Sequence, residues 1–346
     1  MTSRRNRRRV IAALIVLSCL VGFVVYSAAD GRGGGNAAGA DDADPVGDPE
    51  RGLVGTADTN EGEFSLLTYN VAGLPAEMSK LDPGSHLPII GPLLNSYALV
   101  VTQEDFDWWK PDGIGDGLDF EKYHERLVEK STHQYRSEPH PGIDPQGVPP
   151  ERLTDVQFGD GLGVLSRFPI GGNRRVPWSG CFGAPGGGDG GAGDCMALKG
   201  FAYTTLTLAE GVTVDLYNVH GEAGGTESDQ ALQAADFDEL ARFMAANSKG
   251  RAVIVAGDTN LDTDGGADDE IWRTFLAAGD LTDACDATEC STPARVDKVA
   301  FRSGESADLE TILHAPHPKR FVDKAKQPLS DHQALEVRFA WQREGT

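Results

Sequence analysis

One stretch of this 346-residue chain constrains its fold more than any other: residues 251–261, with the sequence RAVIVAGDTNL. Residues 252–256 form a short apolar run rich in β-branched residues, which is typical of a buried strand. Gly257 then lets the backbone turn, and the polar residues Asp258 and Asn260 follow at once. Because side chains two residues apart point to the same side of a strand, we expect these two to lie together at the rim of a sheet. The alternative is an Asx turn that caps the strand end.

Apolar and amphipathic segments elsewhere predict strands that alternate with a few helices. The predicted strands are residues 64–71, 98–102, 161–166, 200–208, 212–219, 296–301, 307–313 and 333–339. The predicted helices are residues 86–97, 120–130, 227–246 and 270–278. A tight turn at residues 209–211 joins two of the strands into a hairpin. This order of elements indicates an α/β fold in which two sheets pack face to face with helices outside.

The N-terminal segment has the pattern of an export signal. The basic residues of MTSRRNRRR precede 17 mostly apolar residues, and small residues follow them. We predict an export signal over residues 1–29, with a retained membrane anchor as the alternative, because the apolar stretch approaches the length of a short membrane span. Residues 30–62 are rich in Gly, Ala and Asp and predict a disordered linker. The folded catalytic domain would then be residues 63–342.

Four cysteines remain after the predicted signal: Cys181, Cys195, Cys285 and Cys290. An even number in an exported chain indicates disulfides, and four cysteines allow three pairings. We predict the pairing that is local in sequence, Cys181 with Cys195 and Cys285 with Cys290, because closing the first loop would restrain its glycine-rich segment. A zinc site is the alternative, although no pair has the Cys-x₂-Cys spacing that zinc sites use.

Polar side chains stand at or near the ends of several predicted strands. They are Asn70, Glu104, Asp160, His220, Asp258, Asn260, Asp297, Asp331 and His332. Each alone has an ordinary explanation as a turn residue, a surface acid or a partly buried histidine. Together, two histidines with several carboxylates and carboxamides suit a hard divalent metal and a histidine base. The sequence contains no nucleophile elbow and no Walker or dinucleotide glycine pattern.

The motifs around these residues, in chain order, resemble those of the endonuclease/exonuclease/phosphatase superfamily, which includes pancreatic-type deoxyribonucleases and neutral sphingomyelinases. They are TYNVAGLP, TQED, DGLGVLSR, NVHGEAG, AGDTNL and SDH. The resemblance spans about residues 64–339 and implies a four-layer α/β sandwich, with two mostly antiparallel sheets and the active site at one edge of the paired sheets. It also implies a metal-dependent phosphodiesterase.

The resemblance further implies metal ligands and a base. Glu104 would be the principal metal ligand, and Asn70, close to it, would be a further ligand. Asp331 would help to bind the metal or tune His332. His332 would take the proton from the attacking water, aligned by Asp297. The implied cofactor is Mg²⁺, with Mn²⁺, Ca²⁺ or Co²⁺ as alternatives.

The same resemblance assigns the residues that handle the phosphate. Asp258 and Asn260 would orient the attacking water and the phosphate. His220 would be a second imidazole that bonds a phosphate oxygen, with Asp160 as its partner. The products would be a phosphomonoester and a free alcohol.

Three features favour a phospholipid headgroup, sphingomyelin first, as the substrate. The net charge of −22 repels a polyanion at long range, and the chain is predicted to be exported. Residues 194–201, DCMALKGF, resemble an element of neutral sphingomyelinase-like members. Trp108, Trp109 and Trp178 would lie at a lipid interface or stack on a choline group, or else pack in the core.

Two alternatives to the lipid hydrolase remain open. An extracellular nonspecific nuclease needs a basic groove, for which the candidates are Arg152, Arg167, Arg174 and Arg175. A non-catalytic interaction protein on the same fold would have lost catalytic positions, and none is lost here. We therefore predict a secreted, monomeric enzyme that contacts a membrane surface, with nucleic acid as the less favoured partner. An N-terminally anchored form with an extracellular domain is the alternative.

Overall fold

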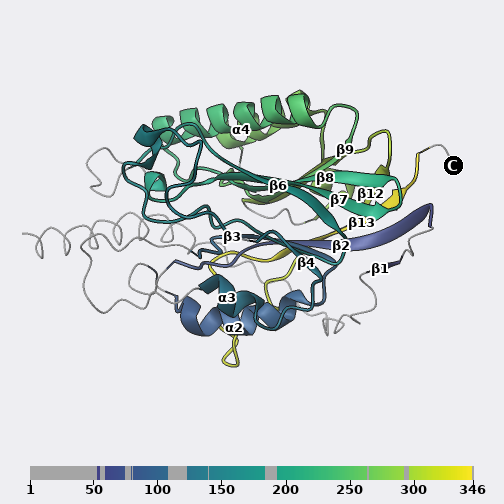
Figure 1. Ribbon diagram of the computed structural model, residues 1–346, viewed down its shortest axis with the longest axis horizontal. Coiled ribbons are helices and arrows are strands. Elements are labelled where there is room, and N and C mark those ends of the chain that lie inside the picture. Colours follow the sequence, from purple (N-terminus) through teal and green to yellow (C-terminus); the bar gives the residue numbers. More distant parts are fainter. Residues whose placement is uncertain are drawn as a thin grey trace, which may run out of the picture.

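Two β-sheets lie face to face, and helices cover the outer face of each (Figure 1). The structure is a computed structural model. It describes residues 53–54, 59–74, 79, 81–107, 123–138, 140–183, 193–262, 265–291 and 296–344. The predicted export signal, most of the predicted linker, Trp108 and Trp109 lie outside these residues.

The first sheet has the strand order β12-β13-β2-β3-β5-β4, with β1 beside β2. Its strands are β1 Leu53–Val54, β2 Glu61–Asn70, β3 Leu99–Gln103, β4 Tyr135–Arg136, β5 Gly163–Ser166, β12 Asp308–Pro316 and β13 Leu335–Gln342. The pair β2–β3 is parallel, and the other pairs of this sheet are antiparallel. Helices α2 (Pro83–Leu94) and α3 (Tyr123–Val128) pack on its outer face.

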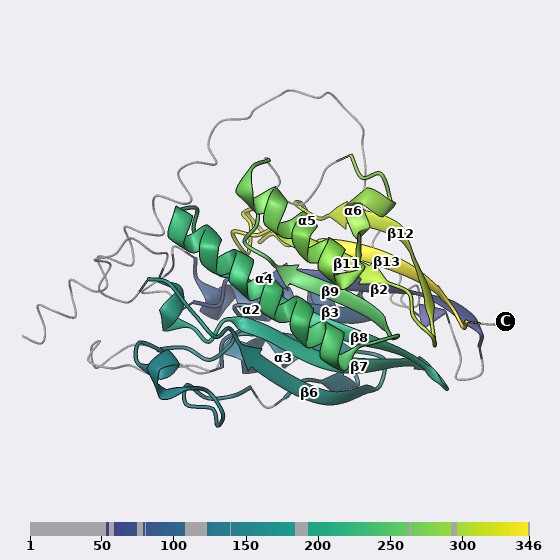
Figure 2. The same cartoon turned by 90° about the horizontal axis from the view of Figure 1, so that it is seen from above.

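The second sheet has the strand order β10-β11-β9-β8-β7-β6. Its strands are β6 Ile170–Pro177, β7 Gly200–Ala209, β8 Val212–His220, β9 Ala252–Asp258, β10 Thr282–Asp283 and β11 Asp297–Arg302. Only β8 and β9 pair in parallel among these described strands. Helices α4 (Glu227–Asn247) and α5 (Ala267–Gly279) lie side by side across its outer face (Figure 2). The short helices are η2 Pro150–Leu153, η3 Asp194–Met196 and α6 Ala284–Ala287.

Alternating apolar side chains explain why these segments fold into layers. Strands of both sheets contribute to a central buried cluster, in which Phe64, Leu216, Ile254 and Phe339 are at most 1% exposed. Two further clusters fill the spaces between each sheet and its helices. Removing this apolar area from water drives the packing of helix, sheet, sheet and helix. The predicted four-layer α/β sandwich with mostly antiparallel sheets is confirmed.

The structure differs from the sequence-based prediction at the sheet margins. Strand β6 escapes prediction because IGGNRRVP has few apolar residues, and the structure explains this: β6 is an edge strand without a fully buried side chain. Strand β1 lies inside the segment predicted to be a disordered linker, and β2 begins at Glu61 rather than Phe64. None of the helices in the described ranges has the length and apolar character that crossing a membrane requires.

Candidate active site

Three neighbouring strands of the second sheet bring His220, Asp258 and Asp297 into one row. Parallel pairing of β8 with β9 sets His220 opposite Asp258. Antiparallel pairing of β9 with β11 sets Asp297 opposite Asp258 on the other side. The three residues are 1–5% exposed. Strand register alone therefore places one imidazole and two carboxylates at the same edge of the sheet.

The first sheet delivers Asn70, Glu104 and His332 to the same place. Asn70 ends β2, and its parallel neighbour β3 ends at Gln103, so that Glu104 directly follows the strand. Glu104 has a φ of 52°, a left-handed conformation that turns the chain at this point. His332 stands just before β13, the antiparallel neighbour of β2. Its backbone N–H donates to the Ser330 hydroxyl, and that hydroxyl donates to the Asn70 carbonyl.

Asn70 joins the two sheets within the site. Its Nδ2 donates to Glu104 Oε1 at 3.1 Å and to Asp258 Oδ2 at 3.0 Å. Its Oδ1 accepts the backbone N–H of Ala72 at 3.0 Å. The structure thus turns the amide NH₂ of Asn70, rather than its oxygen, toward the carboxylates. Asn70 holds Glu104 through its NH₂ group, and its role as a metal ligand stays a prediction.

His332 and Asp297 form a hydrogen-bonded pair at the solvent side of the site. His332 Nδ1 donates to Asp297 Oδ2 at 3.1 Å, which leaves Nε2 at 3.6 Å from Asp258 Oδ2. Burial lowers the pKa of His332, but the negative charges of Asp297 and Asp258 outweigh it and hold this pKa well above its ordinary value. The side chain keeps 17% of its surface exposed. This arrangement fits a histidine that exchanges a proton with water or substrate.

His220 lies on the other side of Asp258, with Nε2 at 3.6 Å from Asp258 Oδ2. Burial, together with the positive charge of Lys199, lowers the pKa of His220 well below its ordinary value, so this ring is neutral. Trp178 Nε1 donates to the His220 carbonyl at 2.9 Å and fixes the end of β8. Trp178 is fully buried against Phe201, so the expected place of Trp178 at a lipid interface is wrong, and its core alternative holds.

Asp160 does not pair with His220, contrary to the sequence-based expectation. Both of its carboxylate oxygens accept from Arg175 Nη1, at 2.9 and 2.7 Å. Asp160 Oδ1 also accepts the N–H of Leu162 and lies 3.9 Å from His140 Nδ1. Arg175 belongs to the edge strand β6 and Asp160 lies just before β5, so Asp160 forms an ion pair with β6.

Asp258 and Asn260 meet through an Asx turn. The N–H of Asn260 donates to Asp258 Oδ1 at 3.0 Å, and Asn260 has a φ of 52°. Asn260 therefore lies beyond the end of the strand, and strand alternation does not orient it. Its Nδ2 donates to the Gly221 carbonyl at 3.0 Å. The Asx turn, which was the alternative explanation of this sequence, therefore holds Asn260 beside Asp258.

Glu104 and Asp331, the carboxylates predicted from the sequence to hold a cation, interact through their charges. Burial and the negative charge of Asp331 raise the pKa of Glu104 to about 7, so its ionised form needs a positive neighbour. Oxygen donors are what Mg²⁺ and similar hard ions bind. Asp258, Asp297 and His332 also place one ligand atom each within 4.8 Å of one another. The donor set thus fits a divalent metal.

Lys199 is a site residue to which the sequence alone assigned no role. Its Nζ lies 2.5 Å from Asp194 Oδ1 and donates to the Gly221 carbonyl at 3.1 Å. Its charge lowers the pKa values of both Glu104 and Asp258. The sequence feature that could have identified this lysine is the DCMALKGF segment, in which Lys199 stands just before a mostly buried strand. The lysine supplies a fixed positive charge beneath the carboxylates.

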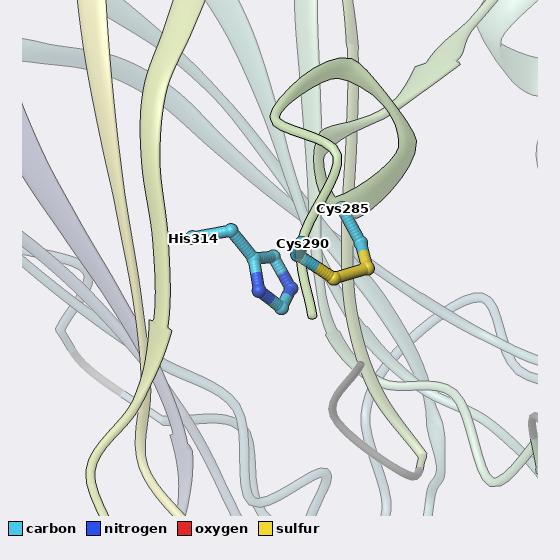
Figure 3. Close-up of side chains that lie close together, drawn as sticks. All are labelled: Cys285, Cys290 and His314. Atoms are coloured by element: carbon cyan, nitrogen blue, oxygen red, sulfur yellow. A yellow bond between two sulfur atoms is a disulfide. The ribbon is translucent and has the colours of Figure 1, made fainter. Parts of the chain in front are cut away.

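Both predicted disulfides are present, Cys181–Cys195 and Cys285–Cys290. The first ties residue 181 to helix η3, which carries Asp194. His314 of β12 lies beside the second, as the close-up in Figure 3 shows. Because these cysteines are joined to each other, the alternative of a cysteine zinc site does not apply to this pair.

Comparison with known proteins agrees with this geometry. Residues 67–332 match the Endonuclease/Exonuclease/phosphatase family. A sphingomyelinase from Mycobacterium tuberculosis is 33% identical over 300 residues, which cover 82% of this chain. They cover 54% of that relative, so the chain spans about half the length of the curated relatives it matches.

Two solved structures share the fold. Sphingomyelinase C from Streptomyces griseocarneus superposes with a TM-score of 0.53 at 18% identity, over 80% of this chain and 99% of that one. A magnesium-bound mutant of beta toxin from Staphylococcus aureus gives 0.53 at 16% identity, over 79% and 98%. The family match extends from strand β2 to His332 and so includes every element that forms the site. The chain belongs to the endonuclease/exonuclease/phosphatase family.

Proposed function

We propose that this protein is a secreted, metal-dependent phosphodiesterase that hydrolyses the headgroup of a phospholipid, with sphingomyelin as its first substrate. The observation that carries the proposal is the shared carboxylate of Asp258, which lies 3.6 Å from both His220 Nε2 and His332 Nε2. The carboxylate partners of His332 raise its pKa, which makes its imidazole the stronger base, whereas burial lowers the pKa of His220. A phosphodiester in this site meets one group that exchanges protons and one that donates a hydrogen bond.

The chain's own residues divide the reaction between them. A water molecule held by Asp258 and Asn260 attacks phosphorus while His332 Nε2 accepts its proton. Asp297 keeps the ring oriented through Nδ1 and stabilises the imidazolium that forms. The bond from phosphorus to the lipid oxygen breaks, that oxygen takes a proton from solvent and leaves as an alcohol, and His332 returns to solvent the proton it accepted. His220 donates a hydrogen bond to a phosphate oxygen throughout.

A divalent ion, Mg²⁺ first, would be held by Glu104 and Asp331. When bound, it neutralises the phosphate and stabilises the charge that builds in the transition state. The carboxylate of Glu104 is already aimed by Asn70, whose Nδ2 also contacts Asp258. The metal ligand and the water-orienting carboxylate are thereby kept in a fixed relation before substrate arrives.

Three observations support a lipid rather than a nucleic acid as substrate. The chain is 33% identical to a protein named sphingomyelinase, and its net charge is −22. Two of the four arginines that are candidates for a basic groove have other partners: Arg175 pairs with Asp160, and Arg152 donates to the carbonyls of Trp178 and Ala197. A zwitterionic headgroup needs no basic groove, whereas a polyanion does. We infer that the enzyme works as a monomer at a membrane surface.

A paired assay separates the two substrates. We expect phosphocholine release from sphingomyelin vesicles with Mg²⁺, and little nicking of supercoiled plasmid in the same buffer. Rapid nicking that weakens steeply with added salt, without phosphocholine release, would instead identify a nuclease. Neither activity, in a protein that is folded by circular dichroism, would favour the non-catalytic interaction protein.

A further inference from the structure

We propose that Asp105, His124 and His140 form a second metal site, suited to Zn²⁺ or a similar transition-metal ion and separate from the catalytic cluster. Asp105 follows Glu104 after β3, His124 belongs to α3, and His140 lies beyond β4. One ligand atom from each lies within 4.8 Å of the other two. The three residues are 1%, 5% and 6% exposed. The proposal does not depend on which phosphodiester the enzyme cleaves.

The carboxylate of Asp105 has one oxygen that accepts no hydrogen bond from the described part of the chain. Its Oδ2 accepts the Thr102 hydroxyl at 3.0 Å and His124 Nδ1 at 2.8 Å. Its Oδ1 is buried and has no hydrogen-bond partner among the described residues. Leaving a buried polar atom unsatisfied destabilises the folded state, and more so when the atom carries charge. A cation bound beside Asp105 removes that destabilisation.

The two imidazoles lie against each other, with ring centroids 4.1 Å apart. Burial lowers the pKa of His140 to about 4, so its ring is neutral and able to bind a metal. Burial also lowers the pKa of His124, but the charge of Asp105 outweighs it and raises this pKa to about 9. In the absence of an ion, a proton therefore sits between His124 and Asp105, and a metal would take its place.

The kind of donor separates this site from the catalytic one. Two imidazole nitrogens and one carboxylate oxygen favour Zn²⁺ and its neighbours over Mg²⁺, which prefers oxygen ligands. Glu104 and Asp331 offer carboxylates instead. Each site should therefore select its own ion when both are supplied.

Such an ion would hold the turn that aims Glu104. This turn has a left-handed residue, Glu104, and is fixed by the N–H of Asp105, which donates to the Gly161 carbonyl at 2.9 Å. A metal on the Asp105 side chain would also tie the turn to α3 and to the segment after β4. The ion would fix the backbone next to Glu104 without contacting the substrate itself.

The test measures metal content of the full-length, untagged protein, stripped with chelator, loaded with Zn²⁺ in excess Mg²⁺ and dialysed. We expect about one tightly held Zn²⁺ per chain. Glu104→Gln, which alters the catalytic cluster, should retain it. His314→Gln, which alters the histidine beside the Cys285–Cys290 disulfide (Figure 3), should also retain it. His140→Gln and Asp105→Asn should lose most of it.

A second measurement needs no variant and so stands even if His140→Gln fails to fold. Zn²⁺ added to the stripped wild-type protein in excess Mg²⁺ should raise the melting temperature, since an ion that binds only the folded state stabilises it. No retained Zn²⁺ and no thermal shift in the wild type would overturn the proposal. Zn²⁺ that His140→Gln holds as tightly as wild type, or that Mg²⁺ displaces, would overturn it equally.

Discussion

One carboxylate, that of Asp258, lies between two histidines whose pKa values are shifted in opposite directions. On one side His332 has a raised pKa because Asp297 and Asp258 both face it. On the other side His220 has a lowered pKa because it is buried beside Lys199. Two identical side chains thus become a proton-exchanging group and a neutral hydrogen-bond donor through their surroundings alone.

Replacing His332 tests the first of these roles. We expect His332→Ala to reduce turnover by on the order of 100-fold or more, the usual effect of removing an acid–base group. Its thermal stability should change little, because the side chain is partly exposed. The matched control is His317→Ala, which breaks another histidine–carboxylate pair, with Glu336 at 2.7 Å. Near wild-type turnover in His332→Ala would assign His332 a structural role.

Glu104→Gln tests the metal ligand. The variant keeps the size of the side chain but removes the negative charge that an ion requires, so we expect most activity to be lost across a Mg²⁺ titration. Exposed Glu305→Gln is the charge-matched control and should behave as wild type. Full activity of Glu104→Gln at ordinary Mg²⁺ concentrations would contradict the assignment.

Among the structural elements, the disulfide loops differ in length and in what they carry. Cys181 and Cys195 are 14 residues apart, and Cys285 and Cys290 are 5 apart. By the chain-entropy argument, replacing the first pair with serines should lower the free energy of unfolding by about 3 kcal/mol, and the second pair by about 2 kcal/mol. Urea unfolding of both double variants measures the difference.

The first disulfide should also affect catalysis, because η3 carries Asp194, the partner of Lys199. We expect the Cys181/Cys195 double serine variant to lose activity at urea concentrations at which it is still folded. The Cys285/Cys290 variant should not. Equal effects of both on activity would mean that the first loop does not support the site.

His133, between α3 and β4, makes the contact of this segment with the chain just before β3 sensitive to pH. Its Nε2 donates to the Tyr97 carbonyl before β3, and its Nδ1 accepts the Ser131 hydroxyl, an arrangement that requires a neutral ring. Burial lowers the pKa of His133 from 6.5 to about 4. The unfolded chain therefore binds this proton more readily, and stability should fall as the pH drops from 6.5 toward 4, by roughly 3 kcal/mol in all.

Comparing His133→Gln with wild type isolates this contribution. The difference in unfolding free energy between the two proteins should shrink as the pH falls through that window and stay constant above it. A difference that does not depend on pH would show that His133 is already protonated in the folded protein, or that it titrates normally.

At the scale of the whole molecule, the sequence predicted the strands that have a clear apolar pattern and the polar residues at the ends of those strands. The strands that build both sheet centres, such as β9, were predictable because burial on both faces demands a continuous apolar run. Edge strand β6 was not, because solvent accepts almost any side chain there. The partner of Asp160 could not be predicted either, since Arg175 reaches it only through the register of packed sheets.

Hydrogen bonds between the two sheets give some polar strand residues a structural role that the sequence does not reveal. Gln103 Nε2 donates to Asn218 Oδ1 at 2.7 Å, and Asn218 Nδ2 donates back to the carbonyls of Thr102 and Gly163. These residues look like ordinary strand residues in the sequence. Their importance appears only when the two layers meet, because a buried amide must be hydrogen-bonded and the partners of Asn218 lie in the opposite sheet.

The contact from Asn70 to Asp258 has a consequence for how activity is acquired. Asn70, Glu104 and His332 come from one sheet, and His220, Asp258 and Asp297 come from the other. Neither sheet alone supplies all six side chains, so a chain in which only one sheet has formed has an incomplete site. Under the proposed function, a nascent or partly unfolded molecule therefore lacks a complete site, and the site is assembled only when the two layers close.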